Sequence, residues 1–506
     1  MKKPTFRAAL AASALIGLAV PAIPAAFAAP VAADTPITEA ELAAHIRVLA
    51  SDAFEGRAPG TAGEDRTIAY IAGEWARAGL EPVKGSDTPW LQPVPLVESR
   101  SLGGEAQFRA KGRAIRLDPQ GLLLNSRDAE ASLDNLPVMF VGYGVDAEGN
   151  VTADVAGKAA IMFFENPPYG KDLPRYRERR RMLAEAGAKA VLVVAPEALG
   201  WERLRGAMSA ASIERVQESG EPAISGFLSQ AAADTLFKQA GFAVDPLRQA
   251  ASDPGYRGAA LPLTADLSAR TEVRAFDSHN VIARLPGANP DGKAVLFLGH
   301  WDHLGLCAPE GAADRICNGA VDNASGIAVL IEVAKRLAKG PRPDRDIYFL
   351  ATTAEEKGLL GAYHFADHPA VPLSDITVAL NLDTVAISPR GTPVATIGRG
   401  RPAHDALVTE VATRLGRKID SDGEADPFVQ RQDGWALGAK GVASLMVGGS
   451  FSDMALLEAF LGDDYHGPGD EFSDKIPLGG AAEDADLHVA LGRAFADKQR
   501  WPGTGD

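Results

Sequence analysis

The chain has 506 residues, of which 46% are hydrophobic and 23% are charged, a composition typical of a soluble protein with more than one domain. Its formal net charge of −15 argues against nucleic acid as a partner, because phosphate binding requires a basic surface. After the N-terminal leader, no segment offers the roughly 20 consecutive apolar residues that a membrane helix needs.

Residues 1–28 have the features of an export signal. Lys2, Lys3 and Arg7 precede a short apolar stretch, and residues 26–28 read Ala-Phe-Ala, which fits cleavage after small residues. Removal of this leader takes three positive charges and changes the net charge from −15 to −18. We therefore expect a periplasmic or secreted protein.

The part that follows, residues 29–110, is interpreted as the beginning of the main domain. Helical periodicity is present at residues 37–52 and 61–80. Between these two stretches lies "FEGRAPGT" (54–61), a loop rich in turn-forming residues.

The middle of the chain, residues 111–275, is expected to be an inserted, smaller α/β domain. A helix is predicted over residues 175–188, and its run "RYRERRR" is interpreted as a solvated face. Strands are predicted at 138–145, 158–165 and 189–196.

Residues 276–506 are expected to form the second part of the main domain. The segment 326–340 has the pattern of an amphipathic helix, and further helices alternate with strand-like runs. Such alternation predicts an α/β fold with a mostly parallel central sheet flanked by helices, in which ligands bind beyond the carboxyl ends of the strands. The strand-like runs of this part of the chain lie at 294–300, 345–353, 376–383 and 443–449.

Polar side chains with metal-binding chemistry follow these strands. Taken singly, each has an ordinary explanation; Asp322, for example, precedes a helix and could cap it. Taken together, two imidazoles and three carboxylates make a set suited to zinc, and two ions sharing one carboxylate lie about 3.5–4 Å apart. The set consists of His300, Asp322, Glu356, Asp383 and His466.

Two further carboxylates lie beside this set. Adjacent side chains on an extended segment point in opposite directions, so Glu355 is expected to act as the general base while Glu356 binds metal. Asp302 is expected to accept a hydrogen bond from the far ring nitrogen of His300. The role of His303 stays open.

Five segments resemble, in order and spacing, those of the co-catalytic zinc exopeptidases, which include bacterial secreted aminopeptidases, glutamate carboxypeptidases and non-catalytic receptor relatives. The resemblance spans residues 294–473, and the middle unit resembles the protease-associated domain often inserted into this family. The segments are "GHWDHLG", "NGAVDNASG", "AEEKGLLGA", "NLD" and "YHGPGDEF".

The resemblance implies two Zn²⁺ ions bridged by Asp322. His300 and Asp383 would complete one ion's site, and Glu356 and His466 the other. It also implies a cis peptide bond after Asp322.

The implied function is that of an exported aminopeptidase that hydrolyses N-terminal residues from peptides. A metal-bridging hydroxide would attack the peptide, with Glu355 as the general base. Three alternatives remain. One is a carboxypeptidase of the same fold, in which Arg399, Arg401 or Arg431 would hold a terminal carboxylate. The others are a single-zinc transferase similar to glutaminyl cyclases and a metal-free, receptor-like binding module.

Two details depart from the family or stay open. Where relatives carry a block resembling "SDH", this chain has Asp433 followed by Gly434, and no tyrosine lies between residues 421 and 438 to stabilise a reaction intermediate. Cys307 and Cys317, the two cysteines of the chain, are expected to form a disulfide in an oxidising compartment, with two free thiols as the alternative.

Overall fold

The computed structural model describes residues 35–83, 88–170, 173–209, 211–216 and 221–502. The expected leader at residues 1–28 lies outside them. Within the described part of the chain, no helix has both the length and the apolar character that crossing a bilayer requires.

Strands and helices alternate along most of the chain. The strands are β1 (Glu81–Pro82), β2 (Leu91–Ala110), β3 (Arg113–Ile115), β4 (Leu122–Ser126), β5 (Glu130–Phe140), β6 (Ala159–Phe163), β7 (Ala190–Val194), β8 (Ser212–Arg215), β9 (Ile224–Leu228), β10 (Ala259–Leu285), β11 (Ala294–His300), β12 (Gly305–Leu306), β13 (Ile316–Cys317), β14 (Asp346–Thr352), β15 (Ile376–Asn381), β16 (Ala395–Ile397) and β17 (Ser444–Gly448). The helices are α1 (Glu39–Leu49), α2 (Ala62–Ala78), α3 (Tyr176–Glu185), α4 (Trp201–Ser209), α5 (Gln230–Gln239), α6 (Val244–Ala251), α7 (Ser325–Lys339), α8 (Leu360–Asp367), α9 (Pro402–Arg414), α10 (Gly434–Gly438), α11 (Met454–Gly462) and α12 (Leu478–Ala496).

The C-terminal half of the chain forms one part of the sheet, with the strand order β16-β17-β15-β11-β14-β10. β17, β15, β11 and β14 run parallel to one another, whereas β16 and β10 are antiparallel to their neighbours. The expected α/β fold with a mostly parallel central sheet is therefore confirmed. The carboxyl ends of four strands meet at one edge of this sheet, where such folds bind their ligands.

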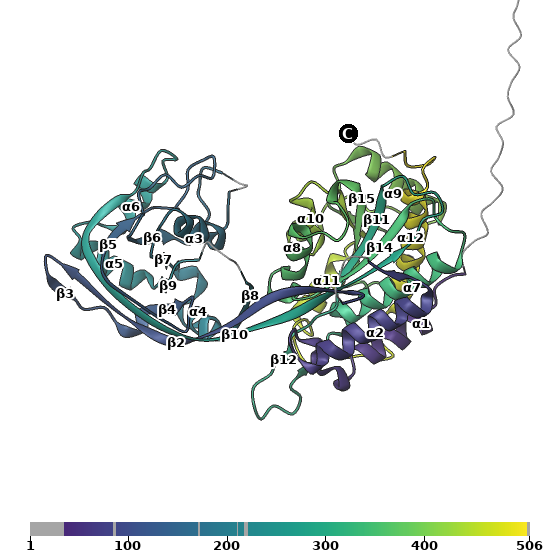
Figure 1. The fold of residues 1–506 in the computed structure, drawn as a ribbon, viewed down its shortest axis with the longest axis horizontal. Coiled ribbons are helices and arrows are strands. Elements are labelled where there is room, and N and C mark those ends of the chain that lie inside the picture. The colour runs from purple at the N-terminus through teal and green to yellow at the C-terminus, as the bar shows by residue number, and fades with distance from the viewer. Residues whose placement is uncertain (1–34, 84–87, 171–172, 210, 217–220, 503–506) are drawn as a thin grey trace, which may run out of the picture. The chain divides into compact units, whose positions relative to one another are not determined.

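Helices cover both faces of this part of the sheet (Figure 1). α1, α2, α7 and α12 pack on one face, in the same cluster as Phe297 and Phe349. α8 and α10 pack on the other face, around Leu298 and Leu350. All seven residues of β11 are buried, which explains why this strand is continuously apolar instead of alternating with polar residues.

The middle of the chain continues the sheet in the order β10-β5-β6-β7-β9-β4. β5, β6, β7 and β9 are parallel, and β4 is antiparallel to β9. α5 and α6 contribute to the core on one face of these strands, while α3 and α4 contribute to the core on the other face. The strands predicted at 158–165 and 189–196 and the helix predicted at 175–188 match β6, β7 and α3 within a few residues. The strand predicted at 138–145 is wrong over most of its length, because β5 ends at Phe140 and residues 141–145 form a turn.

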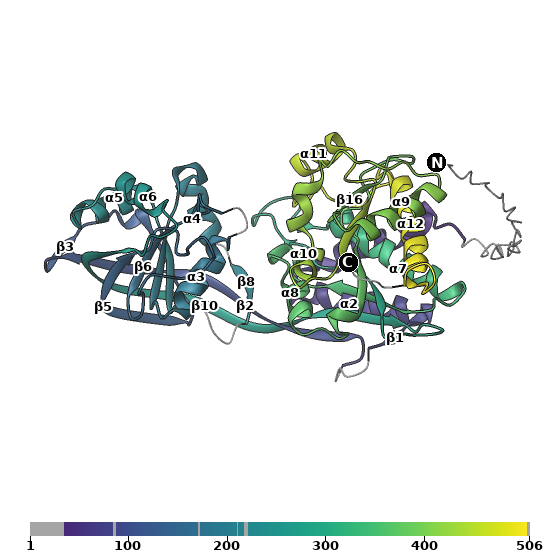
Figure 2. The ribbon, with the colours of Figure 1, turned by 90° about the horizontal axis from the view of Figure 1, so that it is seen from above.

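β2 and β10 are long strands that the sequence patterns do not predict. They pair antiparallel from Leu91 to Ala110, and Figure 2 shows them side by side. β2 contains Pro93, Pro95 and a Gly-Gly pair, residue types that normally weaken a strand. β10 also pairs with β5 near its start and with β14 near its end. It therefore runs across residue 275, the expected end of the middle domain.

Candidate metal centre

The predicted metal-binding side chains come from the carboxyl ends of three neighbouring strands and from two loops. His300 is the last residue of β11, Glu356 lies in the turn after β14, and Asp383 follows β15. Asp322 lies in the turn that leads into α7, and His466 lies in the loop after α11. Parallel pairing of β11 with β14 and β15 brings these strand ends together.

Asp322 lies between two imidazoles. Its Oδ1 is 3.2 Å from Nε2 of His300, and its Oδ2 is 3.4 Å from Nε2 of His466. The carboxylate is buried, and each of its oxygens faces a different histidine. This is the geometry expected of a carboxylate shared by two cations.

The first group of ligand atoms surrounds His300. Its Nε2 is 3.4 Å from Oδ1 of Asp383. This nitrogen is buried, yet it has no hydrogen-bond partner among the described residues. Atoms of His300, Asp322 and Asp383 lie close enough together to hold one metal ion. An unpaired imidazole nitrogen facing two carboxylates fits a divalent cation that accepts nitrogen and oxygen ligands, such as zinc.

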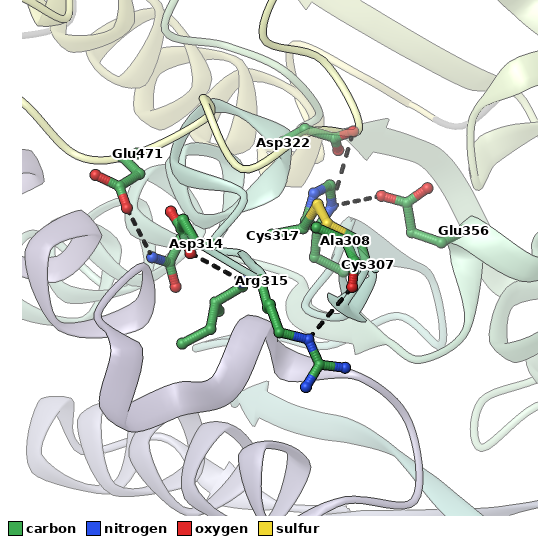
Figure 3. The surroundings of a disulfide bond; sticks show 11 residues. Cys307, Ala308, Asp314, Arg315, Cys317, Asp322, Glu356 and Glu471 are labelled. Carbon is green, nitrogen blue, oxygen red and sulfur yellow. Dashed lines mark hydrogen bonds and ion pairs between the residues drawn. A yellow bond between two sulfur atoms is a disulfide. The ribbon is translucent and has the colours of Figure 1, made fainter. Parts of the chain in front are cut away.

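The second group surrounds Glu356, whose Oε2 is 2.8 Å from Nε2 of His466. Its Oε1 is 2.6 Å from Nδ1 of His303, and the same nitrogen is 4.0 Å from Oδ2 of Asp322; both carboxylates are labelled in Figure 3. His303 is fully buried. The sequence left its role open, and the structure places it against two of the predicted ligands.

Asp302 makes different contacts from those expected. Nδ1 of His300 lies 3.1 Å from the backbone carbonyl oxygen of Asp302, whereas the carboxylate is 3.8 Å away. The carboxylate instead accepts hydrogen bonds from the backbone N–H groups of Glu355 and Glu356, at 3.0 and 3.4 Å. The predicted side-chain contact is therefore wrong, because the β14 turn brings two amide donors nearer. Asp302 orients the Glu355–Glu356 turn directly.

The turn that carries the two glutamates has an unusual backbone. Ala354 and Leu359, on either side of it, have φ values of 51° and 60°, a left-handed conformation that is uncommon for residues other than glycine. This turn separates the directions of the two side chains. Glu355 lines the cavity of the site, while Glu356 faces His466 and His303.

Asn323 connects the strand ends behind the ligands. Its side chain donates to the carbonyl oxygens of His300 and Leu382 and accepts from the N–H groups of Gly326 and Thr384. The peptide bond between Asp322 and Asn323 is cis, as the family resemblance implies.

The charges of the cluster shift its protonation equilibria. Burial raises the pKa of Glu355 well above its usual range, and the nearby carboxylates of Asp383 and Asp433 raise it further. Burial alone would lower the pKa of His300, but Glu355 and Asp383 raise it well above the ordinary value. Burial alone would raise the pKa of Asp322, but the neighbouring imidazoles of His300 and His466 hold it well below its usual range.

Apolar side chains form one part of the wall of the adjoining cavity, beside polar ones such as Thr384, Arg431 and Gln432. Tyr465, directly before His466, lies there too, with its ring stacked on that of His466 at 3.7 Å between centroids. No tyrosine lies between residues 421 and 438, and Tyr465 was not predicted, although its place beside a predicted ligand was a usable signal. The apolar members are Phe428, Met446, Phe451, Leu457 and Leu461.

The three arginines considered for binding a terminal carboxylate lie in different places. Arg431 lines the cavity. Arg399 pairs with Asp426 at 3.1 Å, and Arg401 donates to the carbonyl oxygen of Gly441. Of these three arginines, Arg431 alone is a lining residue of the cavity.

The segment with Asp433 and Gly434 lies against the base of the site. Asp433 is buried and accepts a hydrogen bond from the hydroxyl of Thr352, and burial raises its pKa to about 7. A Cβ atom added to Gly434 would collide with Oγ of Ser444. The histidine expected from related proteins therefore has no room here.

A disulfide closes the hairpin that lies between His300 and Asp322 in the sequence. Cys307 and Cys317 are bonded, with their Cα atoms 5.7 Å apart, so the expected pairing is confirmed. The bond joins residues just after β12 and at the end of β13, two strands that pair antiparallel. Figure 3 shows the disulfide in the surroundings of Asp322 and Glu356.

Comparison with known proteins adds family and fold. Residues 280–490 match Peptidase family M28. A probable zinc metalloprotease of Leptosphaeria maculans is 30% identical over 153 residues, 29% of this chain and 34% of that protein. Aminopeptidase YwaD of Bacillus subtilis is 33% identical over 131 residues, 25% of this chain and 26% of that protein. Each match thus covers about a third or less of the curated relative's length.

A solved structure extends the likeness to most of the chain. The aminopeptidase from Aneurinibacillus sp. strain AM-1 superposes with a TM-score of 0.50 at 18% sequence identity. The match covers 91% of this chain and 94% of that one. At this level of identity, the likeness concerns the fold alone.

Proposed function

For this chain, whose residues 280–490 match peptidase family M28, we propose the function of a zinc-dependent aminopeptidase. The observation that carries the proposal is the position of Asp322, with each carboxylate oxygen facing a separate imidazole. The names of two relatives, a probable zinc metalloprotease and an aminopeptidase, support the same chemistry.

Two zinc ions are the proposed cofactors. His300 and Asp383 would hold one ion, Glu356 and His466 the other, and Asp322 both. When bound, zinc supplies a Lewis acid for the scissile carbonyl and lowers the pKa of water.

Glu355 is the proposed general base. Its carboxylate lies in the cavity, with Oε2 4.0 Å from Nε2 of His300, a position that suits a group that first takes up a proton and then returns it. Glu355 accepts a proton from the attacking water while the oxygen of that water bonds to the carbonyl carbon. It then donates this proton to the leaving nitrogen as the C–N bond breaks.

Tyr465 is the proposed hydrogen-bond donor to the carbonyl oxygen. Burial raises the pKa of its hydroxyl, with a further rise from the carboxylates of Asp322 and Glu356, so it stays protonated at neutral pH. A protonated hydroxyl in the cavity can stabilise negative charge that develops on the substrate.

The cavity suggests the class of substrate. The apolar part of its wall favours an apolar first residue, because burial of such a side chain contributes about 1.5–3 kcal/mol. The carboxylates of Glu355 and Asp383 face the same cavity and suit a free, positively charged amine.

The test is zinc content combined with hydrolysis of a peptide panel. We expect about two zinc ions per chain and cleavage of free-amine substrates with Leu, Phe or Met first. The same peptides with a blocked amine are the matched control and should not be cleaved. A protein without zinc that cleaves nothing after zinc is added contradicts the proposal and favours a binding module.

A carboxypeptidase is the second candidate, because Arg431 lines the cavity. In that case, N-blocked peptides with a free carboxylate would be the better substrates. Arg431→Gln would then raise KM for them, whereas an aminopeptidase should show little change on free-amine substrates.

Two further features belong to the proposal. Residues 1–28 serve as a cleaved export signal that directs the protein to the periplasm or medium, and N-terminal sequencing of the exported protein tests this.

Residues 111–275 form a domain similar to protease-associated domains, inserted between residues 29–110 and 276–506. The strand order β5-β6-β7-β9 with helices on both faces supports a separate middle unit, and β10 runs across its expected end at residue 275.

A further inference from the structure

Arg57, in the loop "FEGRAPGT", is buried behind the proposed metal centre. Its side chain is 1% exposed, and its guanidinium donates four hydrogen bonds to backbone carbonyl oxygens. The acceptors are Trp301 at 2.8 Å, Leu49 at 2.9 Å, Asn318 at 2.6 Å and Gly319 at 2.9 Å.

Three of these acceptors lie in the loops next to His300 and Asp322, and the fourth, Leu49, ends α1. Trp301 directly follows His300, and Gly319 begins the turn that contains Asp322. The backbone carbonyl oxygen of Arg57 also accepts a hydrogen bond from the N–H of His303, at 3.3 Å. One residue from the N-terminal part of the chain thus joins two loops that are otherwise separated by the disulfide hairpin.

The backbone of this loop is adapted to the contact. Glu55, Gly56 and Arg57 have φ values of 50°, 65° and 52°, and consecutive left-handed residues of this kind are costly unless their surroundings fix them. A Cβ atom added to Gly56 would lie 2.5 Å from the carbonyl oxygen of Cys317. The loop therefore approaches the hairpin as closely as glycine allows.

The guanidinium also supplies a positive charge beside the acidic cluster. Among the described residues, no carboxylate lies within ion-pair distance of Arg57, but Asp470, Asp322 and Asp302 stabilise its charge at longer range. Burial lowers the pKa of Arg57 to about 10, so the side chain is charged at neutral pH. Without metal, this charge offsets repulsion among the ligand carboxylates.

Asp470 completes the support of the Asp322 turn. Its carboxylate accepts hydrogen bonds from the N–H groups of Val321 and Asp322, at 2.8 and 3.0 Å. Its backbone carbonyl oxygen accepts another from Ala320, at 3.0 Å. The turn is thus held on its carbonyl side by Arg57 and on its amide side by Asp470.

We propose that Arg57 is a positioning residue that keeps the ligands His300 and Asp322 assembled before metal binds. This inference rests on the proposed zinc function. Within the described part of the chain, the Arg57 side chain forms no hydrogen bond or ion pair with a ligand side chain; it acts through the backbone of the two loops. Lysine cannot replace it, because an ammonium group lacks the planar fork of donors that reaches four carbonyls in different directions.

The test compares Arg57→Lys with Arg179→Lys. Arg179 is a close match, since it is fully buried and its guanidinium also donates to four carbonyl oxygens, those of Tyr143, Phe163, Phe164 and Glu165. It lies on α3, in the middle part of the chain. For each purified, metal-free protein, Zn²⁺ affinity is measured by competition with a chromophoric chelator, and the melting temperature is recorded.

We expect Arg57→Lys to weaken Zn²⁺ binding by about tenfold or more, as residues that orient metal ligands do, and Arg179→Lys to change it less than about twofold. Both variants should lose thermal stability. Equal Zn²⁺ affinities for wild type and Arg57→Lys, or an equal loss in both variants, would overturn the inference alone. A wild-type protein that binds no Zn²⁺ overturns the proposed function together with it.

Hydrogen exchange of the wild type decides the matter if Arg57→Lys does not fold. We expect the amides of His303, Val321 and Asp322 to be protected in metal-free protein and to change little when Zn²⁺ is added. Exchange as fast as that of an exposed loop until Zn²⁺ is added would show that the metal, not Arg57, assembles the loops.

Discussion

Glu355 and Glu356 are neighbours in sequence with different surroundings. Glu356 contacts two imidazoles, whereas Glu355 faces the cavity and has a strongly raised pKa. Mutations at the two positions should therefore affect different properties.

Glu355→Gln should keep both zinc ions but reduce kcat by about 10²–10⁴-fold, because the amide cannot accept the proton of water. Metal analysis and initial rates measure the two effects. Glu356→Gln is the matched control and should lose zinc. Normal turnover by Glu355→Gln would contradict the base assignment.

His488 on α12 makes stability depend on pH. It is fully buried, and its Nδ1 donates to the carbonyl oxygen of Asp484 at 2.7 Å. Burial lowers its pKa to about 4 from an ordinary value of 6.5, so between these values only the unfolded chain takes up the proton. Stability should therefore fall as the pH drops from 6.5 to 4, by about 3 kcal/mol from this residue.

His488→Leu should remove this part of the pH dependence. Urea unfolding at several pH values gives the free energy of unfolding. The effect of His488 is the difference between wild type and variant in how steeply this free energy changes with pH. Parallel curves for the two proteins between pH 6.5 and 4 would contradict the prediction.

Four of the five predicted ligands could be singled out because each follows a strand or precedes a helix. His466, in the loop after α11, was singled out because its segment resembles one of the zinc exopeptidases. Arg57, Asp470 and Tyr465 gave weaker signals. A buried arginine that binds backbone carbonyls has no partner visible in sequence. The Asp302 carboxylate was assigned to the wrong partner, because the sequence does not reveal that the turn after β14 turns its amides toward it.

The disulfide hairpin of β12 and β13 is the element for which a stability change is easiest to predict. It closes a short loop, with the two cysteines 10 residues apart. In the chain-entropy model, a disulfide that closes a loop of this length reduces the entropy of the unfolded chain and so stabilises the folded protein by about 3 kcal/mol.

Replacement of both cysteines, Cys307→Ala with Cys317→Ala, should lower the free energy of unfolding by about that amount. Urea unfolding with and without a reducing agent measures it. Wild type should lose similar stability on reduction, whereas the double variant should not respond. A wild type that is equally stable in both conditions would contradict the expectation.

Elements with a clear apolar pattern were predictable, and those without one were not. The helix at α7 and the buried strands β11 and β15 were expected within a few residues of their observed bounds. β2 was not expected, because its prolines and glycines are strand breakers. Its pairing with β10 over nearly its whole length outweighs those local preferences.

For the molecule as a whole, zinc should contribute to stability as well as to chemistry. A metal that binds only the folded chain stabilises it by about 2.7 kcal/mol when its free concentration is 100 times the dissociation constant. Removal of zinc with a chelator should lower the melting temperature, and added zinc should restore it.

Asp322→Asn is the control for this measurement. It should melt at the same temperature with and without chelator, because the shared ligand is weakened. An unchanged melting temperature of the wild type after complete zinc removal would contradict the prediction.

β10 is shared by the middle and the C-terminal parts of the sheet. It forms hydrogen bonds with β5 in the middle part and with β14 in the C-terminal part. A shortened protein that lacks the middle segment would keep part of β10 with a bare edge, and bare edges pair with other chains. Engineers who wish to exchange this segment among related enzymes should therefore cut beyond the shared strands and transfer β2 and β10 as a pair.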